Sequence, residues 1–196
     1  MTARGPVVAF DLGGVLVDVD KDHLRSFGPR DVVDRAFHGP HHDAATVGDL
    51  DEHDFAVAIA ASLARDGVMI GVEHARDAWA RVVSWRPGAA ALLGACASRV
   101  TTHVWSNTDP IHWRVLGAAI DGVVAHAATS FRVRAAKPAA AFYVRALSGL
   151  DPERVLFFDD RADNVAAARA MGIDAVVCAS VDDARARLRA RGVDVG

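Results

Sequence analysis

Cysteine is scarce in this sequence: among 196 residues only Cys96 and Cys178 occur, far apart and each in apolar surroundings. Small secreted domains usually carry several disulfides. Two distant cysteines instead indicate reduced thiols inside the cell. We therefore expect a cytoplasmic protein in which both cysteines are small core residues.

Long apolar runs and a strong charge of one sign are also missing. No segment reaches the roughly 18 consecutive apolar residues that a membrane-spanning helix needs. The apolar run near the N-terminus is too short for the core of a signal peptide and lacks a cleavage site. The net charge is only −3, which gives no reason to expect a nucleic-acid partner. We expect neither a membrane nor a nucleic acid as partner, and the composition leaves monomer and homodimer open.

The chain changes character between residues 19 and 86, where convincing strands are lacking. Helical patterns are found there at 21–27, 31–37, 52–65 and 73–85. Asp51 is well placed to cap the third of these helices, with Asp54 at its third position. The Gly-Pro segment 38–43 carries three histidines. Its tight spacing does not match structural zinc sites, so we expect a loop cluster there.

Outside this region, helices and strands alternate. Strands are expected at 7–11, 100–105, 123–127, 155–158 and 174–178, and helices at 88–98, 110–119, 139–149, 161–171 and 181–191. Right-handed crossovers then give a parallel sheet. The sequence predicts an α/β fold, a Rossmann-like parallel sheet with helices on both faces plus an inserted all-helical segment. Residues 1–18 and 87–196 would form the core domain, and 19–86 the insert.

Polar residues follow several of the predicted strands. Asp11 ends the first one, Ser106 and Asn107 end the second, and Asp159 and Asp160 end a later one. In open α/β sheets ligands bind at the carboxyl ends of the strands, so these residues are placed for chemistry. Two adjacent acids at a strand end repel each other unless a cation binds there. The pair therefore favours a metal site, and oxygen ligands suit Mg²⁺.

Lysine is as rare as cysteine, because Lys21 and Lys137 are the only two. Lys137 stands before Pro138, which suits the first position of the helix that follows. In chain order the polar residues are thus an Asp, a Ser, a Lys and an Asp pair. This ordered set, from Asp11 to Gly172, resembles the four motifs of the haloacid dehalogenase (HAD) superfamily, most of whose members are Mg²⁺-dependent phosphatases.

The resemblance implies a role for each motif residue. Asp11 would be the nucleophile that forms an aspartyl-phosphate intermediate. The Gly13 carbonyl and the Asp160 carboxylate would complete the Mg²⁺ site with Asp11, while Asp159 would act through water or Lys137. Ser106 and the Asn107 amide would hold the phosphate oxygens, and Lys137 would add positive charge. Asn164 would steady Asp160. The helical insert resembles the C1-type cap that selects the substrate in this superfamily.

Gly13 departs from the pattern, because most of these phosphatases have a second Asp there as general acid and base. Such help is worth roughly 10²–10⁴-fold in rate. A substrate with a better leaving group, or a cap histidine such as His38 or His42, could compensate. The motifs also resemble those of bacterial α-D-glucose-1-phosphate phosphatases, which share the glycine and are active, and of the phosphatase domain of soluble epoxide hydrolase, which keeps the acid.

We therefore expect a Mg²⁺-dependent phosphatase of a small phosphorylated metabolite, with sugar phosphates the first class to consider. A metal-independent haloacid dehalogenase is one alternative, although it would gain nothing from the Asp159–Asp160 pair. A weakly active or non-catalytic phosphate-binding module is another, supported by Gly13 alone. A phosphomutase is disfavoured, since it needs the acid that Gly13 lacks.

Overall fold

The computed structural model describes residues 5–196. Its centre is a five-stranded parallel sheet in the order β5-β4-β1-β6-β7. The strands are β1 (Val7–Phe10), β4 (Thr101–Ser106), β5 (His126–Thr129), β6 (Val155–Asp159) and β7 (Asp174–Val177). All four residues of β1 are buried because helices cover both faces of the sheet. The predicted Rossmann-like sheet is confirmed.

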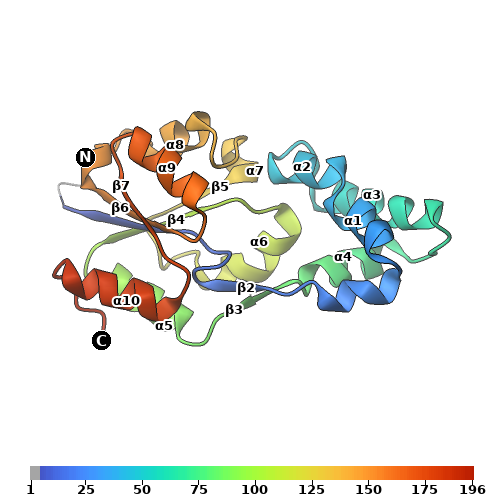
Figure 1. The fold of residues 1–196 in the computed structure, drawn as a ribbon, viewed down its shortest axis with the longest axis horizontal. Coiled ribbons are helices and arrows are strands. Elements are labelled where there is room, and N and C mark those ends of the chain that lie inside the picture. The colour runs from blue at the N-terminus through green and yellow to red at the C-terminus, as the bar shows by residue number, and fades with distance from the viewer. Residues whose placement is uncertain (1–4) are drawn as a thin grey trace.

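Two layers of helices enclose the sheet (Figure 1). One face packs against α5 (Ala89–Ala97), α6 (Pro110–Leu116) and α10 (Val181–Ala190), whose apolar side chains meet Val8 and Phe10. The opposite face packs against α8 (Ala140–Leu147) and α9 (Ala162–Ala170), which cover Val7 and Ala9. Both cysteines are free and buried, as expected. No helix in residues 5–196 has the length and apolarity to span a membrane.

The helical insert lies beside the carboxyl ends of the strands (Figure 1). It contains η1 (Asp22–Phe27), α1 (Arg30–His38), α2 (Pro40–Thr46), α3 (Glu52–Arg65) and α4 (Val72–Ala80). The predicted cap of α3 is confirmed, because the Asp51 side chain accepts a hydrogen bond from the Asp54 amide. The remaining short elements are η2 (Gly117–Ala119), α7 (Ser130–Val133) and η3 (Pro152–Arg154).

Three details of the predicted secondary structure are wrong. The insert is not wholly helical at its ends, since β2 (Val17–Val19) and β3 (Val83–Trp85) form a two-stranded antiparallel ribbon. The predicted helix 73–85 therefore stops at Ala80. Segment 38–43 is not a loop, because Pro40 occupies the first turn of α2, where its missing N–H costs nothing. Pro138 precedes α8 instead of beginning it, and Ala139 is the N-cap.

Candidate active site

The loop after β1 holds Asp11 at the edge of the sheet. The Asp11 amide donates to the Phe158 carbonyl at 2.8 Å, which extends the pairing of β1 with β6 by one residue. The Leu12 carbonyl then accepts the amides of Val15, Leu16 and Val17, so the chain turns sharply at Gly13 and Gly14. Asp11 is 7% exposed, and its Oδ1 accepts the Leu12 amide at 2.7 Å. Its carboxylate thus lies at the carboxyl end of the central strand.

The end of β6 supplies two carboxylates in different surroundings. Asp159 is fully buried, and its oxygens accept the Arg161 amide at 2.9 Å and the Asn164 side-chain amide at 3.0 and 3.1 Å. Asp160 is only partly buried and lies against Gly14 of the loop after β1. The sequence predicts that Asn164 steadies Asp160, but its side-chain amide bonds Asp159 instead. Asp160 lies just past the end of β6, and its side chain lies against Gly14.

Lys137 joins the two strand ends. Its Nζ lies 3.0 Å from Asp11 Oδ1 and 2.6 Å from Asp159 Oδ2, and it donates to the Trp105 carbonyl at 2.8 Å. The Lys137 backbone is held by the Asn107 side chain through two hydrogen bonds of 2.8 Å, one to its N–H and one to its carbonyl. Of the two routes expected for Asp159, through water or through Lys137, the structure contains the direct contact with Lys137.

One buried ammonium faces three carboxylates in this cluster. Ligand oxygens of Asp11, Asp159 and Asp160 all lie within 4.8 Å of one another. Burial raises the pKa of Asp11 to about 6; Lys137 opposes the rise and Asp159 adds to it. Burial and then the Asp159 charge also raise the pKa of Asp160. The ionised cluster is short of positive charge, and a divalent cation would supply it.

The donor set fits Mg²⁺ in particular. It offers carboxylate oxygens and no sulfur or imidazole, which is the ligand chemistry of a hard cation. Gly13 lines the same cavity, and its carbonyl accepts no hydrogen bond described within residues 5–196. It therefore has both lone pairs available.

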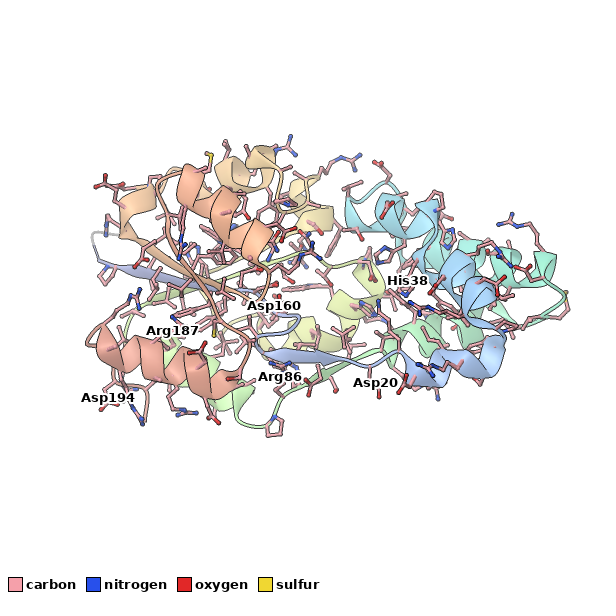
Figure 2. The ribbon with its side chains drawn as sticks, in the orientation of Figure 1. Asp20, His38, Arg86, Asp160, Arg187 and Asp194 are labelled. Atoms are coloured by element: carbon pink, nitrogen blue, oxygen red, sulfur yellow. The ribbon has the colours of Figure 1, made fainter. Side chains whose placement is uncertain are left out.

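A cavity of about 990 Å³ opens over this cluster. Figure 2 shows Asp160 and Arg86 where the sheet meets the insert, and Asp20 and His38 on the insert side. Arg86 was not singled out from the sequence: it bonds Asp18 at 2.7 Å, the Gly14 carbonyl and the Ala179 carbonyl, and so fixes the turn after β1. The cavity is lined by six of the predicted site residues, namely Asp11, Gly13, Asn107, Lys137, Asp160 and Asn164.

A second cavity of about 150 Å³ adjoins the first on the side of the insert. Ser106 lines this one, while Asp159 lies beneath both and lines neither. Trp79 of α4 forms one of its walls, and its indole N–H donates to Asp109 Oδ2 at 2.9 Å, which ties the insert to the loop after β4. Local sequence patterns carry no signal for this pair, because the partners are 30 residues apart in different elements.

The two histidines named as replacements for the missing acid lie on the insert. His42 lines the small cavity together with Gly13, whereas His38 lines neither of the two. Burial, and then the charge of Lys21, lowers the pKa of His38 to about 4. Burial likewise lowers the pKa of His42. Both shifts favour the neutral ring, which has no proton to give as an acid at neutral pH.

The fold and this cluster define an α/β protein with an acidic site at the carboxyl end of its first strand. The haloacid dehalogenase-like hydrolase model matches residues 6–172. The chain belongs to this family of hydrolases.

Solved structures of the family share the fold at low sequence identity. A HAD family enzyme from Bacteroides thetaiotaomicron in complex with magnesium and inorganic phosphate is 20% identical, with a TM-score of 0.78 over 88% of this chain and 93% of that one. A predicted HAD-like hydrolase from Porphyromonas gingivalis is 19% identical, with a TM-score of 0.75 over 90% and 92%. An L-2-haloacid dehalogenase from Xanthobacter autotrophicus with covalently bound chloropropionic acid is 19% identical, with a TM-score of 0.65 over 96% and 84%.

Proposed function

We propose that this chain is a Mg²⁺-dependent phosphatase of a small phosphorylated metabolite, with sugar phosphates as the first class to test. The observation that carries the proposal is the cluster of Asp11, Asp159 and Asp160 around the single buried Lys137. Three carboxylates with one ammonium retain net negative charge, and burying it without a further cation is costly. A magnesium and phosphate complex of the enzyme from Bacteroides thetaiotaomicron adds support, since its fold is the same.

Asp11 is proposed as the nucleophile. Its Oδ1 is held by Lys137 and the Leu12 amide, which fixes the carboxylate at the floor of the large cavity. Attack by the carboxylate on phosphorus forms an aspartyl phosphate and releases the alcohol, and water then hydrolyses that intermediate. The ionised carboxylate is the reactive form, so its contact with Lys137 serves the reaction.

Asp11, Asp160 and the Gly13 carbonyl would hold Mg²⁺, which supplies positive charge between the nucleophile and the phosphate when bound. Asp159 keeps Lys137 in place, and Asn164 keeps Asp159 in place through its side-chain amide. Ser106 and the Asn107 backbone amide would hold the phosphate oxygens. Lys137 contributes a fixed positive charge to the same oxygens.

The insert would act as the cap that selects the substrate. We propose the division inferred from sequence, with a core of residues 1–18 and 87–196 and a cap of 19–86. Support comes from the cavities, whose linings combine core residues such as Asn107 with insert residues such as Lys21. The protein is proposed to work in the cytoplasm, as its two free cysteines suggest.

The direct test is phosphate release from a panel of phosphate monoesters with Mg²⁺ and with chelator. We expect Mg²⁺-dependent turnover of at least one small ester. The Asp11→Asn variant should lose turnover while its thermal unfolding stays close to that of the wild type. Because the proposed function rests on Asp11, substantial residual activity in this variant would contradict it.

A second assay separates the alternatives. The likeness to L-2-haloacid dehalogenase makes chloride release from a short haloacid the matched control. Chloride release that persists with chelator would favour a dehalogenase. Phosphate binding without turnover of any ester would favour a non-catalytic phosphate-binding module, the outcome that Gly13 alone supports.

A further inference from the structure

The two cavities meet at four residues, Gly13, Val19, Lys21 and Asn107, which line both of them. A molecule whose phosphate lies at Asp11 would therefore extend past Lys21 to enter the small cavity. Lys21 directly follows the β2 segment that leads into the insert, and it is exposed to solvent at this junction. Lys21 therefore lines the passage that the part of a substrate beyond the phosphate would enter.

Lys21 is the one cation of these linings without a carboxylate partner in the described part of the chain. Lys137 is shared by Asp11 and Asp159. Arg86 is paired with Asp18 at 2.7 Å, and Arg161 with Asp163 at 2.7 Å. No carboxylate of residues 5–196 lies within 4.0 Å of the Lys21 ammonium; Asp34, which lines a further cavity with Lys21, acts on its charge from beyond that distance. Lys21 therefore makes no ion pair that a ligand would have to break.

The small cavity differs from the large one in its charge. The large cavity is lined by four acidic residues, Asp11, Asp18, Asp20 and Asp160. The lining of the small cavity contains no acidic residue, and its charged or titratable members are Lys21, His42 and His112. The large cavity is also lined by Arg86, Lys137 and Arg161, each already paired with a carboxylate. A second anion on a substrate would therefore gain more from Lys21 on the side of the small cavity, whose lining holds no carboxylate.

Hydrogen-bond donors are also available in the small cavity. Ser106 and Thr108 contribute hydroxyl groups to its wall. The ring nitrogens of His112 are already used, since one lies 2.9 Å from the Trp79 carbonyl and the other 3.0 Å from Asp109 Oδ2. Asp109 is itself covered by Trp79 and His112, so its charge does not face the cavity. Because Ser106 is proposed to hold the phosphate, the donors left for a second group are Lys21, His42 and the Thr108 hydroxyl.

We propose that Lys21 and the small cavity bind a second anionic group of the substrate, which makes the substrate a short phosphate monoester bearing a carboxylate or a second phosphate. This inference rests on the proposed phosphatase function and narrows its substrate class. The volume of about 150 Å³ limits the group. A cavity of this size suits a small group such as a carboxylate better than a bulky one. Lys21 is then a specificity-determining residue.

Non-hydrolysable phosphonates test the inference by binding, without turnover. Ethylphosphonate has the two-carbon chain of phosphonoacetate with a methyl group in place of the carboxylate, and methylenebisphosphonate replaces the carboxylate with a second phosphonate. Calorimetric titration with saturating Mg²⁺ should show phosphonoacetate or methylenebisphosphonate binding about tenfold tighter than ethylphosphonate, the worth of one charge-assisted hydrogen bond. If phosphonoacetate binds more tightly, the second anion is a carboxylate; if methylenebisphosphonate does, it is a second phosphate.

Lys21→Gln should remove this preference and leave ethylphosphonate binding unchanged. Arg65→Gln removes a charge from the same insert at a residue that lines neither cavity, and it should keep the preference. Equal binding of the three ligands to the wild type, or an equal loss for all three in Lys21→Gln, would overturn the inference while leaving the phosphatase intact. Failure of every phosphonate to bind would overturn the proposed function as well.

Turnover gives an independent check on what Lys21 does. Lys21→Gln should raise KM for anionic esters and leave neutral esters of equal length unaffected. The opposite outcome is a fall in kcat that grows with the basicity of the leaving alcohol and does not depend on the charge of the ester. It would mean that Lys21 protonates the leaving group and does not bind an anion.

Discussion

The Asp160 carboxylate occupies the space that a β-carbon on Gly14 would need. Gly14 also has φ = +72°, a conformation that other residues adopt only at a cost. The turn after β1 can therefore approach the end of β6 only with glycine at this position. This close approach brings Asp160 into the acidic cluster with Asp11.

Gly14→Ala should displace Asp160 and weaken Mg²⁺ binding by about ten- to a hundredfold, the usual effect of disturbing the support of a metal ligand. Gly13→Ala is the matched control. A β-carbon there would meet only Val19 Cγ2, at 3.8 Å, and the Gly13 carbonyl is retained. Calorimetric Mg²⁺ titration of both variants measures the effect. Equal Mg²⁺ affinities would show that Asp160 does not bind the ion.

The space beside Gly13 allows a proton donor to be restored. Gly13→Asp should fit without strain and add the acid that the sequence lacks, and general acid catalysis is worth roughly 10²–10⁴-fold. We expect faster turnover of alkyl phosphates and little change for nitrophenyl phosphate, whose leaving group needs no proton. The isosteric Gly13→Asn variant should show no gain. If the two variants hydrolyse alkyl phosphates equally fast, the leaving group is protonated by another residue or by solvent.

Local signals predicted the parts of the fold that depend on neighbouring residues. Helix α3 has the predicted bounds, 52–65, because Asp51 caps it and its apolar residues follow one period. Strand β3 was mistaken for the end of a helix. Its pairing joins Val17 to Trp85, and contacts so far apart in the chain leave no trace in local periodicity. Helix α2 was missed because Gly39-Pro40 suits a turn as well as a helix start.

The site was predictable in outline, because strand ends converge at one edge of a parallel sheet. That rule predicts from the strand positions alone that Asp11, Ser106 and Asp159 lie close together. The partner of Asn164 and the place of Lys21 depend on how the side chains and the insert pack. Sequence spacing carries no information on either.

Removing Lys137 should destabilise the fold. Lys137→Met leaves Asp11 and Asp159 buried without their shared cation, and breaking a buried ion pair on one side costs about 3–5 kcal/mol. Since Mg²⁺ would supply positive charge to the same carboxylates, it should raise the unfolding midpoint of Lys137→Met more than that of the wild type. Lys21→Met, which removes the other lysine from an exposed position, should change the free energy of unfolding by less than about 0.5 kcal/mol. Equal stability of the two variants in urea would contradict the role of Lys137 as a buried counter-charge.

Two histidines on neighbouring strands of the sheet should make stability depend on pH. His103 of β4 is 6% exposed, and its ring lies 5.4 Å from that of His126 on β5. Burial, and then the charge of His126, lowers the pKa of His103 to about 4. Burial also lowers the pKa of His126.

The unfolded chain therefore binds more protons than the folded one between the ordinary histidine pKa of 6.5 and about 4. The stabilising contribution of His103 is complete above that range and is lost as the pH falls through it, with a slope of at most ~1.4 kcal/mol per pH unit. His103→Leu should reduce the loss of unfolding free energy in urea between about pH 7 and about pH 5, whereas the exposed His53→Leu should leave it unchanged. Because His103 Nδ1 has no hydrogen-bond partner within the described residues, the leucine variant breaks no contact of that nitrogen. A pH dependence identical to that of the wild type would show that His103 titrates alike in the folded and unfolded chain.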